Sequence, residues 1–134
     1  MGKKRDVVLI AGPPCAGKTT LAHKIAKGHE VVDYDEIAGG QKKGYIEAVE
    51  NEVQRRIDRI ASDPSARAIV IRMMPRGSDR EDMARRIGAN RVLLVKPSER
   101  ICRLRAASRP SGTRKSIGLW FWRYTSSEVD EVVY

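Results

Sequence analysis

An eight-residue segment near the N-terminus has the residue types and spacing of a loop that holds phosphate. It consists of Gly12, Pro13, Pro14, Cys15, Ala16, Gly17, Lys18 and Thr19, and it fits the pattern G-x-x-x-x-G-K-[ST] in full. In such a loop, backbone N–H groups surround the phosphates, and the glycines allow an approach that a Cβ would obstruct. We expect Lys18 to reach the β- and γ-phosphates and the Thr19 hydroxyl to bind Mg²⁺, with Cys15 and Thr20 adding backbone or packing contacts. The segment predicts binding of ATP or a closely related nucleoside triphosphate.

Two carboxylates, Asp33 and Asp35, follow the next apolar segment of the chain. In an extended segment, residues two apart point to the same side. One carboxylate can then hold Mg²⁺, and the other can accept a proton from an attacking hydroxyl. We favour Asp35 as the base and substrate contact and Asp33 as the metal ligand. The reverse assignment and a solvated pair of turn carboxylates are the alternatives.

Two groups of arginines have the chemistry to bind phosphate oxygens. Arg105 and Arg109 are four residues apart on a helix expected over about residues 98–115, where they would share one face. Guanidinium groups on a closing lid helix would stabilise the charge of a transferred phosphoryl group. A second group follows the third apolar segment and is expected to grip an acceptor phosphate: Arg72, Arg76 and Arg80. The alternative for both groups is a solvated basic surface.

These residues sit between apolar segments that alternate with helical patterns. The expected strands are residues 7–11, 30–33, 68–71 and 91–95, with residues 129–134 as a fifth, edge strand. The expected helices are residues 18–27, 44–62, 78–87, about 98–115, and a last helix that carries the aromatic residues. The alternation predicts an α/β fold with a parallel sheet and right-handed crossovers. Ligands in such sheets lie outside the carboxyl ends of the strands, where the candidate residues fall.

Local patterns refine two of the helices. The segment Ser78-Asp79-Arg80-Glu81 fits a capping box, which places a helix N-terminus at Ser78. In the last helix, Ile117, Trp120, Phe121 and Tyr124 have the spacing of one buried face. Trp122 lies outside this face of the helix and is the better candidate for stacking on a base.

The composition limits the classes of protein that fit. A length of 134 residues suits one domain, and 41% hydrophobic with 32% charged residues is typical of neither disordered, collagen-like nor membrane proteins. We expect a cytoplasmic protein whose two cysteines, Cys15 and Cys102, are free thiols. The formal net charge of +9 favours polyanionic ligands, without deciding between a phosphorylated substrate and nucleic acid.

Three motifs together resemble the small P-loop kinases of the P-loop NTPase superfamily. They are GPPCAGKTTLA (the Walker A loop), VVDYDEIA, and a helix with the pattern P-x-E-R-x-C-x-x-R-x-x-x-R-P. Closest in pattern are phage and bacterial proteins described as AAA-family or zeta-toxin-like ATP-binding proteins, and polynucleotide kinase and shikimate kinase share the layout. The resemblance implies a three-layer fold, with helices on both faces of a parallel sheet of four to five strands in the order 2-3-1-4-5. It also implies a single domain over residues 1–134, with ATP and Mg²⁺ bound at Lys18 and Thr19.

Three functions follow as hypotheses. The first is a phosphotransferase that moves the γ-phosphate of ATP to a hydroxyl or phosphate acceptor, with a nucleotide or a nucleic-acid 5′ end favoured by the charge. The second is a nucleotide-gated binding protein or slow NTPase without a kinase acceptor. The third is a zeta-toxin-like kinase of a sugar nucleotide. The third strand ends in Arg72-Met73-Met74 and lacks the acid that many ATPases place there, which favours a kinase. No membrane partner is expected.

Overall fold

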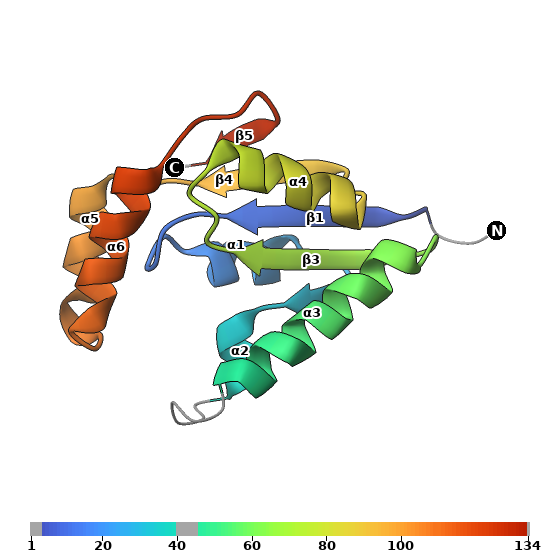
Figure 1. The fold of residues 1–134 in the computed structure, drawn as a ribbon, viewed down its shortest axis with the longest axis horizontal. Coiled ribbons are helices and arrows are strands. Elements are labelled where there is room, and N and C mark those ends of the chain that lie inside the picture. The colour runs from blue at the N-terminus through green and yellow to red at the C-terminus, as the bar shows by residue number, and fades with distance from the viewer. Residues whose placement is uncertain (1–3, 40–45, 134) are drawn as a thin grey trace.

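A computed structural model describes residues 4–39 and 46–133. Its centre is a parallel sheet of five strands in the order β2-β3-β1-β4-β5, as predicted (Figure 1). The strands are β1 (Asp6–Ala11), β2 (Glu30–Val32), β3 (Arg67–Arg72), β4 (Arg91–Val95) and β5 (Asp130–Val133). All five carboxyl ends therefore lie at one edge of the sheet.

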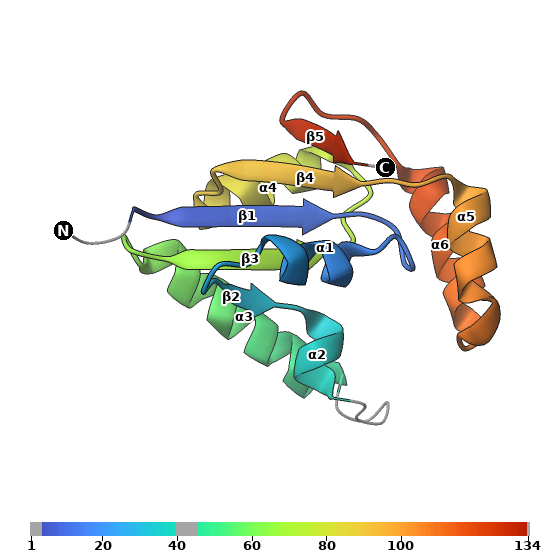
Figure 2. The same ribbon diagram turned by 180° about the vertical axis from the view of Figure 1, so that it is seen from behind.

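Helices cover both faces of the sheet because the central strands are apolar on both sides. Val7 and Leu9 of β1 pack with α3 (Ile46–Ser62) and α4 (Gly77–Ile87), while Val8 and Ile10 pack with α1 (Lys18–Ile25). Figure 2 shows α1 in front of the sheet and α3 behind it. In α3, the residues Val49, Val53, Ile57 and Ile60 recur at helical spacing and are buried. The expected helix over residues 44–62 is confirmed from Ile46; its first two residues lie outside the described residues.

The remaining helices lie beyond the carboxyl ends of the strands. They are the five-residue α2 (Tyr34–Ala38) after β2, then α5 (Glu99–Arg105), a 3-10 turn η2 (Ala106–Ser108) and α6 (Gly112–Arg123). The helix expected over about residues 98–115 is interrupted after η2, and α6 includes both its last residues and the expected last helix. α5 and α6 pack together as a helical hairpin (Figure 1). On α6, Ile117 and Trp120 are buried and pack inward as predicted, whereas Trp122 is 82% exposed. Among the described residues, no helix is long and apolar enough to cross a membrane.

Two helix ends differ from the prediction. α1 ends at Ile25 rather than near residue 27, since Ala26 is already extended. α4 begins at Gly77, and its N-cap position is Arg76, so the predicted capping box at Ser78 is wrong. The N–H of Gly77, in the first turn of the helix, donates to the Thr125 hydroxyl over 2.8 Å, and the backbone of Ser126 packs against Gly77. A Cβ at Gly77 would lie 2.3 Å from the Ser126 carbonyl oxygen.

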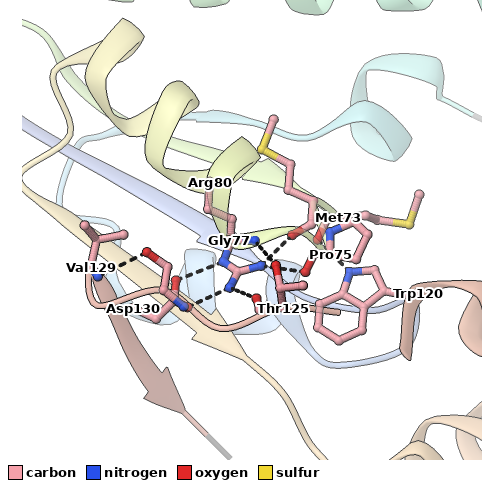
Figure 3. A network of polar contacts seen from close by, with 10 residues as sticks. Met73, Pro75, Gly77, Arg80, Trp120, Thr125, Val129 and Asp130 are labelled. Atoms are coloured by element: carbon pink, nitrogen blue, oxygen red, sulfur yellow. Dashed lines mark hydrogen bonds and ion pairs between the residues drawn. The ribbon is translucent and has the colours of Figure 1, made fainter. Parts of the chain in front are cut away.

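A buried arginine fixes β5 to the rest of the domain. Arg80 on α4 is fully buried and forms an ion pair with Asp130, with Nη2 2.6 Å from Oδ2 (Figure 3). Its remaining N–H groups donate to the carbonyl oxygens of Met74, Pro75 and Thr125. The hypothesis that Arg80 grips an acceptor phosphate is therefore wrong: its guanidinium has no contact left for a ligand.

Candidate active site

The loop formed by Gly12–Thr19 connects β1 to α1 and adopts a strained, compact backbone. Cys15 has φ of 63° and Gly17 has φ of 98°, both in the left-handed region. Gly12 must be glycine for a different reason, because a Cβ there would lie 2.2 Å from the carbonyl oxygen of Val95. Such turns direct successive N–H groups to one side, which forms a concave site for anions.

Lys18 lies at the first position of α1 and folds back over this loop. Its Nζ donates to the carbonyl oxygens of Gly12, at 2.8 Å, and Pro13, at 2.7 Å. Burial lowers the pKa of Lys18 from 10.5 to about 8, and the carboxylates of Asp33 and Asp35 only partly oppose this shift. A triphosphate would supply the negative charge that the buried ammonium lacks.

Asp33 and Thr19 form the second element of the site. The Thr19 hydroxyl donates to Oδ2 of Asp33 over 2.7 Å, and Asp33 is only 4% exposed. A hydroxyl and a carboxylate are oxygen ligands of the type that Mg²⁺ prefers. The two side chains therefore fit the predicted metal site. Among the described residues no cluster of three or more His, Cys, Asp or Glu forms a further metal site.

Asp35 lies close to Asp33 but not in the geometry predicted. The strand β2 ends at Val32, and Asp33, whose backbone is still extended, is the N-cap of α2 and accepts a hydrogen bond from the Asp35 N–H over 3.1 Å. Asp35 is thus in the first turn of a helix, and the prediction that both residues belong to an extended segment is wrong. The consequence is a difference between the two carboxylates: Asp33 is buried with both oxygens bonded, whereas Asp35 is exposed.

A cleft of about 880 Å³ brings these elements together. Its walls come from the Gly12–Thr19 loop with Thr20, the segment after β2, α3, the end of β3 and the start of α6. The lining residues are Pro14–Thr20, Asp33, Tyr34, Asp35, Ile46, Glu50, Ile71–Pro75, Arg109, Pro110 and Thr113. The cleft lies outside the carboxyl ends of the strands, where ligands bind in sheets of this type.

The fold has known counterparts. The chain shares it with a sugar kinase from Janibacter sp. HTCC2649, at 19% identity, a TM-score of 0.62, and coverage of 98% of this chain and 85% of that one. It also resembles TT1252 from Thermus thermophilus, at 18% identity, a TM-score of 0.52, and coverage of 92% and 82%. No protein-family model matches the chain, and no curated protein matches it.

Of the arginines predicted to bind phosphate, some line the cleft and others do not. Arg72 and Arg109 line the cleft. Arg105 is not among the residues that line the cleft, and its Nη1 donates to the carbonyl oxygens of Cys15 and Ala16, each over 3.2 Å. Arg105 and Arg109 do not share a helix face, because η2 separates them. Arg76, the exposed N-cap residue of α4, is not among the residues that line the cleft.

Several lining residues were missed by sequence reasoning. Glu50 on α3 pairs with Arg72, with Nη2 2.9 Å from Oε1. Burial raises the pKa of Glu50, but hydrogen bonds from Arg72 and Gln54 outweigh this effect and hold it below its ordinary value. No local pattern marks Glu50, since only the packing of α3 against β3 brings it to the cleft. Met74 has φ of 33°, rare for a residue with a side chain, at the turn that follows β3.

The carbonyl oxygen of Met73, just after β3, accepts hydrogen bonds both from the helical hairpin and from the Gly12–Thr19 loop. The Trp120 Nε1 donates to this oxygen over 2.7 Å (Figure 3). The Gly12 N–H donates to the same oxygen over 3.3 Å. Both cysteines are free thiols, as predicted: Cys15 lines the cleft and packs against the cluster that contains the buried Cys102.

Proposed function

We propose that this chain is a P-loop kinase, which binds ATP with Mg²⁺ and transfers the γ-phosphate to an acceptor hydroxyl or phosphate. The observation that carries the proposal is the meeting of Lys18, the Thr19–Asp33 pair and the exposed Asp35 in one cleft. On this hypothesis the Gly12–Thr19 loop holds the triphosphate through its backbone N–H groups, and Lys18 neutralises the β- and γ-phosphates.

The two carboxylates take different roles in the proposal. Asp33 is buried and bonded to Thr19, which suits a residue that holds Mg²⁺. The ion would withdraw charge from the phosphate oxygens as the bond to the leaving group breaks. Asp35 is exposed in the same cleft, so it can accept the proton of an acceptor hydroxyl. The acceptor oxygen then bonds to the γ-phosphorus, the bond to the β-phosphate oxygen breaks, and ADP leaves.

The cleft wall beyond Asp35 provides the groups to position an acceptor. Arg72 is 20% exposed and oriented by Glu50, which suits a hydroxyl or phosphate group of the acceptor. The α5–α6 hairpin serves as the lid in this proposal, with Arg109 in the cleft and Arg105 reaching the γ-phosphate on closure. We favour a nucleotide or a nucleic-acid 5′ end as acceptor, on the basis of the +9 charge. Arg76 remains a hypothetical acceptor contact that would require movement of the α4 N-terminus.

Phosphate transfer tests the proposal directly. Purified protein is incubated with Mg²⁺, γ-labelled ATP and a panel of nucleosides, nucleotides, 5′-hydroxyl oligonucleotides, sugar nucleotides and simple sugars. The expected result is label on one class of acceptor, and loss of this label by at least a hundredfold in Asp35→Asn. The matched control is Glu36→Gln, because Glu36 is the next acidic residue on α2, pairs with His23 and does not line the cleft.

Two other results would favour one of the alternative functions. Slow release of free phosphate, unchanged by Asp35→Asn and with no labelled acceptor, would favour a nucleotide-gated binding protein or slow NTPase. Label on a sugar nucleotide alone would favour the zeta-toxin-like alternative.

A further inference from the structure

The α5–α6 hairpin carries most of the excess positive charge of the chain. Residues 99–123 contain seven Arg and Lys residues and a single acidic residue, Glu99, which leaves +6 of the formal +9 in this segment. Arg109 lines the candidate active-site cleft, and Arg105 donates to the backbone of the Gly12–Thr19 loop. The other five are all exposed: Arg100, Arg103, Arg114, Lys115 and Arg123.

These side chains do not serve packing. Among the described residues, no hydrogen bond or ion pair with another side chain engages Arg100, Arg114, Lys115 or Arg123. Arg103 alone is paired, through Nε, with Glu99 on the same helix. Such an exposed pair contributes little to stability. The hairpin therefore keeps a dense set of like charges at its surface, which self-repulsion makes unfavourable without an anionic partner.

The arginines line an open hollow that is separate from the active-site cleft. Arg100, Arg103 and Arg114 form its sides together with Glu99 and the 66% exposed Leu104, and none of these residues lines the cleft. The guanidinium of Arg103 lies across Gly118 of α6, where a Cβ would come within 2.9 Å of its Nη2. Glycine at position 118 thus leaves room for the Arg103 guanidinium beside α6.

Trp122 continues the same surface. Arg114, Gly118 and Trp122 are spaced four residues apart, so they form one row along α6. The row spans about 12 Å, which equals three to four nucleotides at the roughly 3.4 Å rise of a stacked strand. Trp122 is 82% exposed, whereas Trp120, two residues earlier, is 3% exposed and fills the aromatic core position. The second indole is not needed for packing.

We propose that this face, made of Arg100, Arg103, Arg114 and Trp122, binds single-stranded nucleic acid. Unpaired bases offer a π-face for Trp122, and the phosphates between them meet the guanidinium groups of the hollow. A membrane surface fits less well, because the apolar face of α6 is turned into the core and the exposed apolar residues are interrupted by arginines. This binding does not depend on the phosphoryl transfer proposed above and needs no ATP.

Binding is measured by fluorescence anisotropy of a labelled 12-residue oligothymidylate at low salt, without nucleotide. Trp122→Ala should weaken binding about tenfold or more, and Trp122→Phe should retain most of it. Arg114→Ala should weaken binding and reduce the slope of log Kd against log salt by about 0.7 per lost phosphate contact. The control is Arg85→Ala, which removes one positive charge from an exposed side chain of α4. It should lower the affinity for the oligonucleotide only slightly, through the change in net charge. Trp122, Arg114 and Arg85 are all exposed, so thermal unfolding should be unchanged in each of the four variants.

Other outcomes would overturn the proposal. These are the absence of oligonucleotide binding, equal losses in Arg85→Ala and Arg114→Ala, or tighter binding of anionic lipid vesicles or polyglutamate than of the oligonucleotide. Lys18→Ala separates the two sites: it should abolish ATP binding and leave oligonucleotide binding intact. Loss of both in Lys18→Ala would place the strand in the cleft and contradict a separate surface.

Discussion

The Thr19 hydroxyl donates a hydrogen bond to Oδ2 of Asp33 over 2.7 Å and so joins the first turn of α1 to the residue that follows β2. Thr19 and Asp33 are 14 residues apart and follow two strands, β1 and β2, that are not neighbours in the sheet, since β3 lies between them. The pairing depends on the parallel arrangement, which brings the carboxyl ends of all strands to one edge. It places a hydroxyl and a carboxylate together in the cleft, and the proposed function assigns the binding of Mg²⁺ to this pair.

We expect Asp33→Asn to remove the Mg²⁺ dependence of ATP binding. The substitution removes the charge but keeps an oxygen that can accept the Asp35 N–H, so the N-cap of α2 survives. Calorimetry with and without Mg²⁺ should show a gain in ATP affinity for the wild type that is reduced roughly tenfold or more in the variant. Glu36→Gln on the same helix is the control and should behave as the wild type. An unchanged Mg²⁺ effect in Asp33→Asn would exclude Asp33 as a metal-side group.

ATP binding should weaken as the pH rises through the pKa of Lys18. Burial lowers this pKa to about 8 in the free protein, and bound phosphates would raise it because they favour the charged form. The affinity is then fully present well below pH 8 and falls above it, by roughly tenfold between pH 7 and pH 9. Titration calorimetry at pH 8 in two buffers of different ionisation heat should also detect proton uptake. Lys18→Met should bind weakly and equally at both pH values; a pH effect that persists there would assign it to another group.

The phosphate-binding loop and the strands of the sheet could be predicted, because each is marked by residues that are close together in the sequence. The Gly12–Thr19 loop is marked by its own residues, and the sheet order followed from the resemblance that the loop and two further motifs carry. Residues 7–11 of β1 are a continuous apolar run, without the alternation of apolar and polar residues seen in half-exposed strands. This run predicts a parallel strand with helices on both faces, and both faces of β1 are buried in the structure. The edge strand β5 was also expected from its apolar tail.

Features that depend on distant partners were not predictable. Arg80 has the appearance of a surface arginine in a helix, and only the return of the chain after α6 places Asp130 beside it, 50 residues later. The position of Asp35 in a helix differs from the prediction for a local reason: Asp33 ends the strand by capping α2, whereas the prediction continues the extended segment through Asp35. The Glu50–Arg72 pair likewise arises from packing of α3 against β3.

Breaking the Arg80–Asp130 pair should destabilise the protein strongly. Both side chains are almost fully buried, at 0% and 3% exposed, so removal of one partner leaves an uncompensated charge. We expect Arg80→Met or Asp130→Asn to lower the free energy of unfolding by about 3–5 kcal/mol in urea titrations. The control is Arg85→Met, because the Arg85–Asp82 pair lies on the same helix but is exposed, and its loss should cost less than about 1 kcal/mol. Equal effects of Arg80→Met and Arg85→Met would show that burial of the Arg80 pair does not matter.

Trp120→Phe should weaken ATP binding although Trp120 is not among the residues that line the cleft. The phenyl ring preserves the aromatic packing against Tyr124 but removes the Nε1 donor, so the Met73 carbonyl keeps only the longer bond from Gly12. We expect a loss of about 1–2 kcal/mol in the free energy of unfolding, together with a several-fold weaker ATP affinity because the start of the Gly12–Thr19 loop loses its support. Trp122→Phe is the matched control: the same change two residues later, at an exposed side chain, should leave both quantities unaltered. If Trp120→Phe lowers stability but leaves ATP affinity unchanged, the hydrogen bond holds the hairpin to the sheet without supporting the loop.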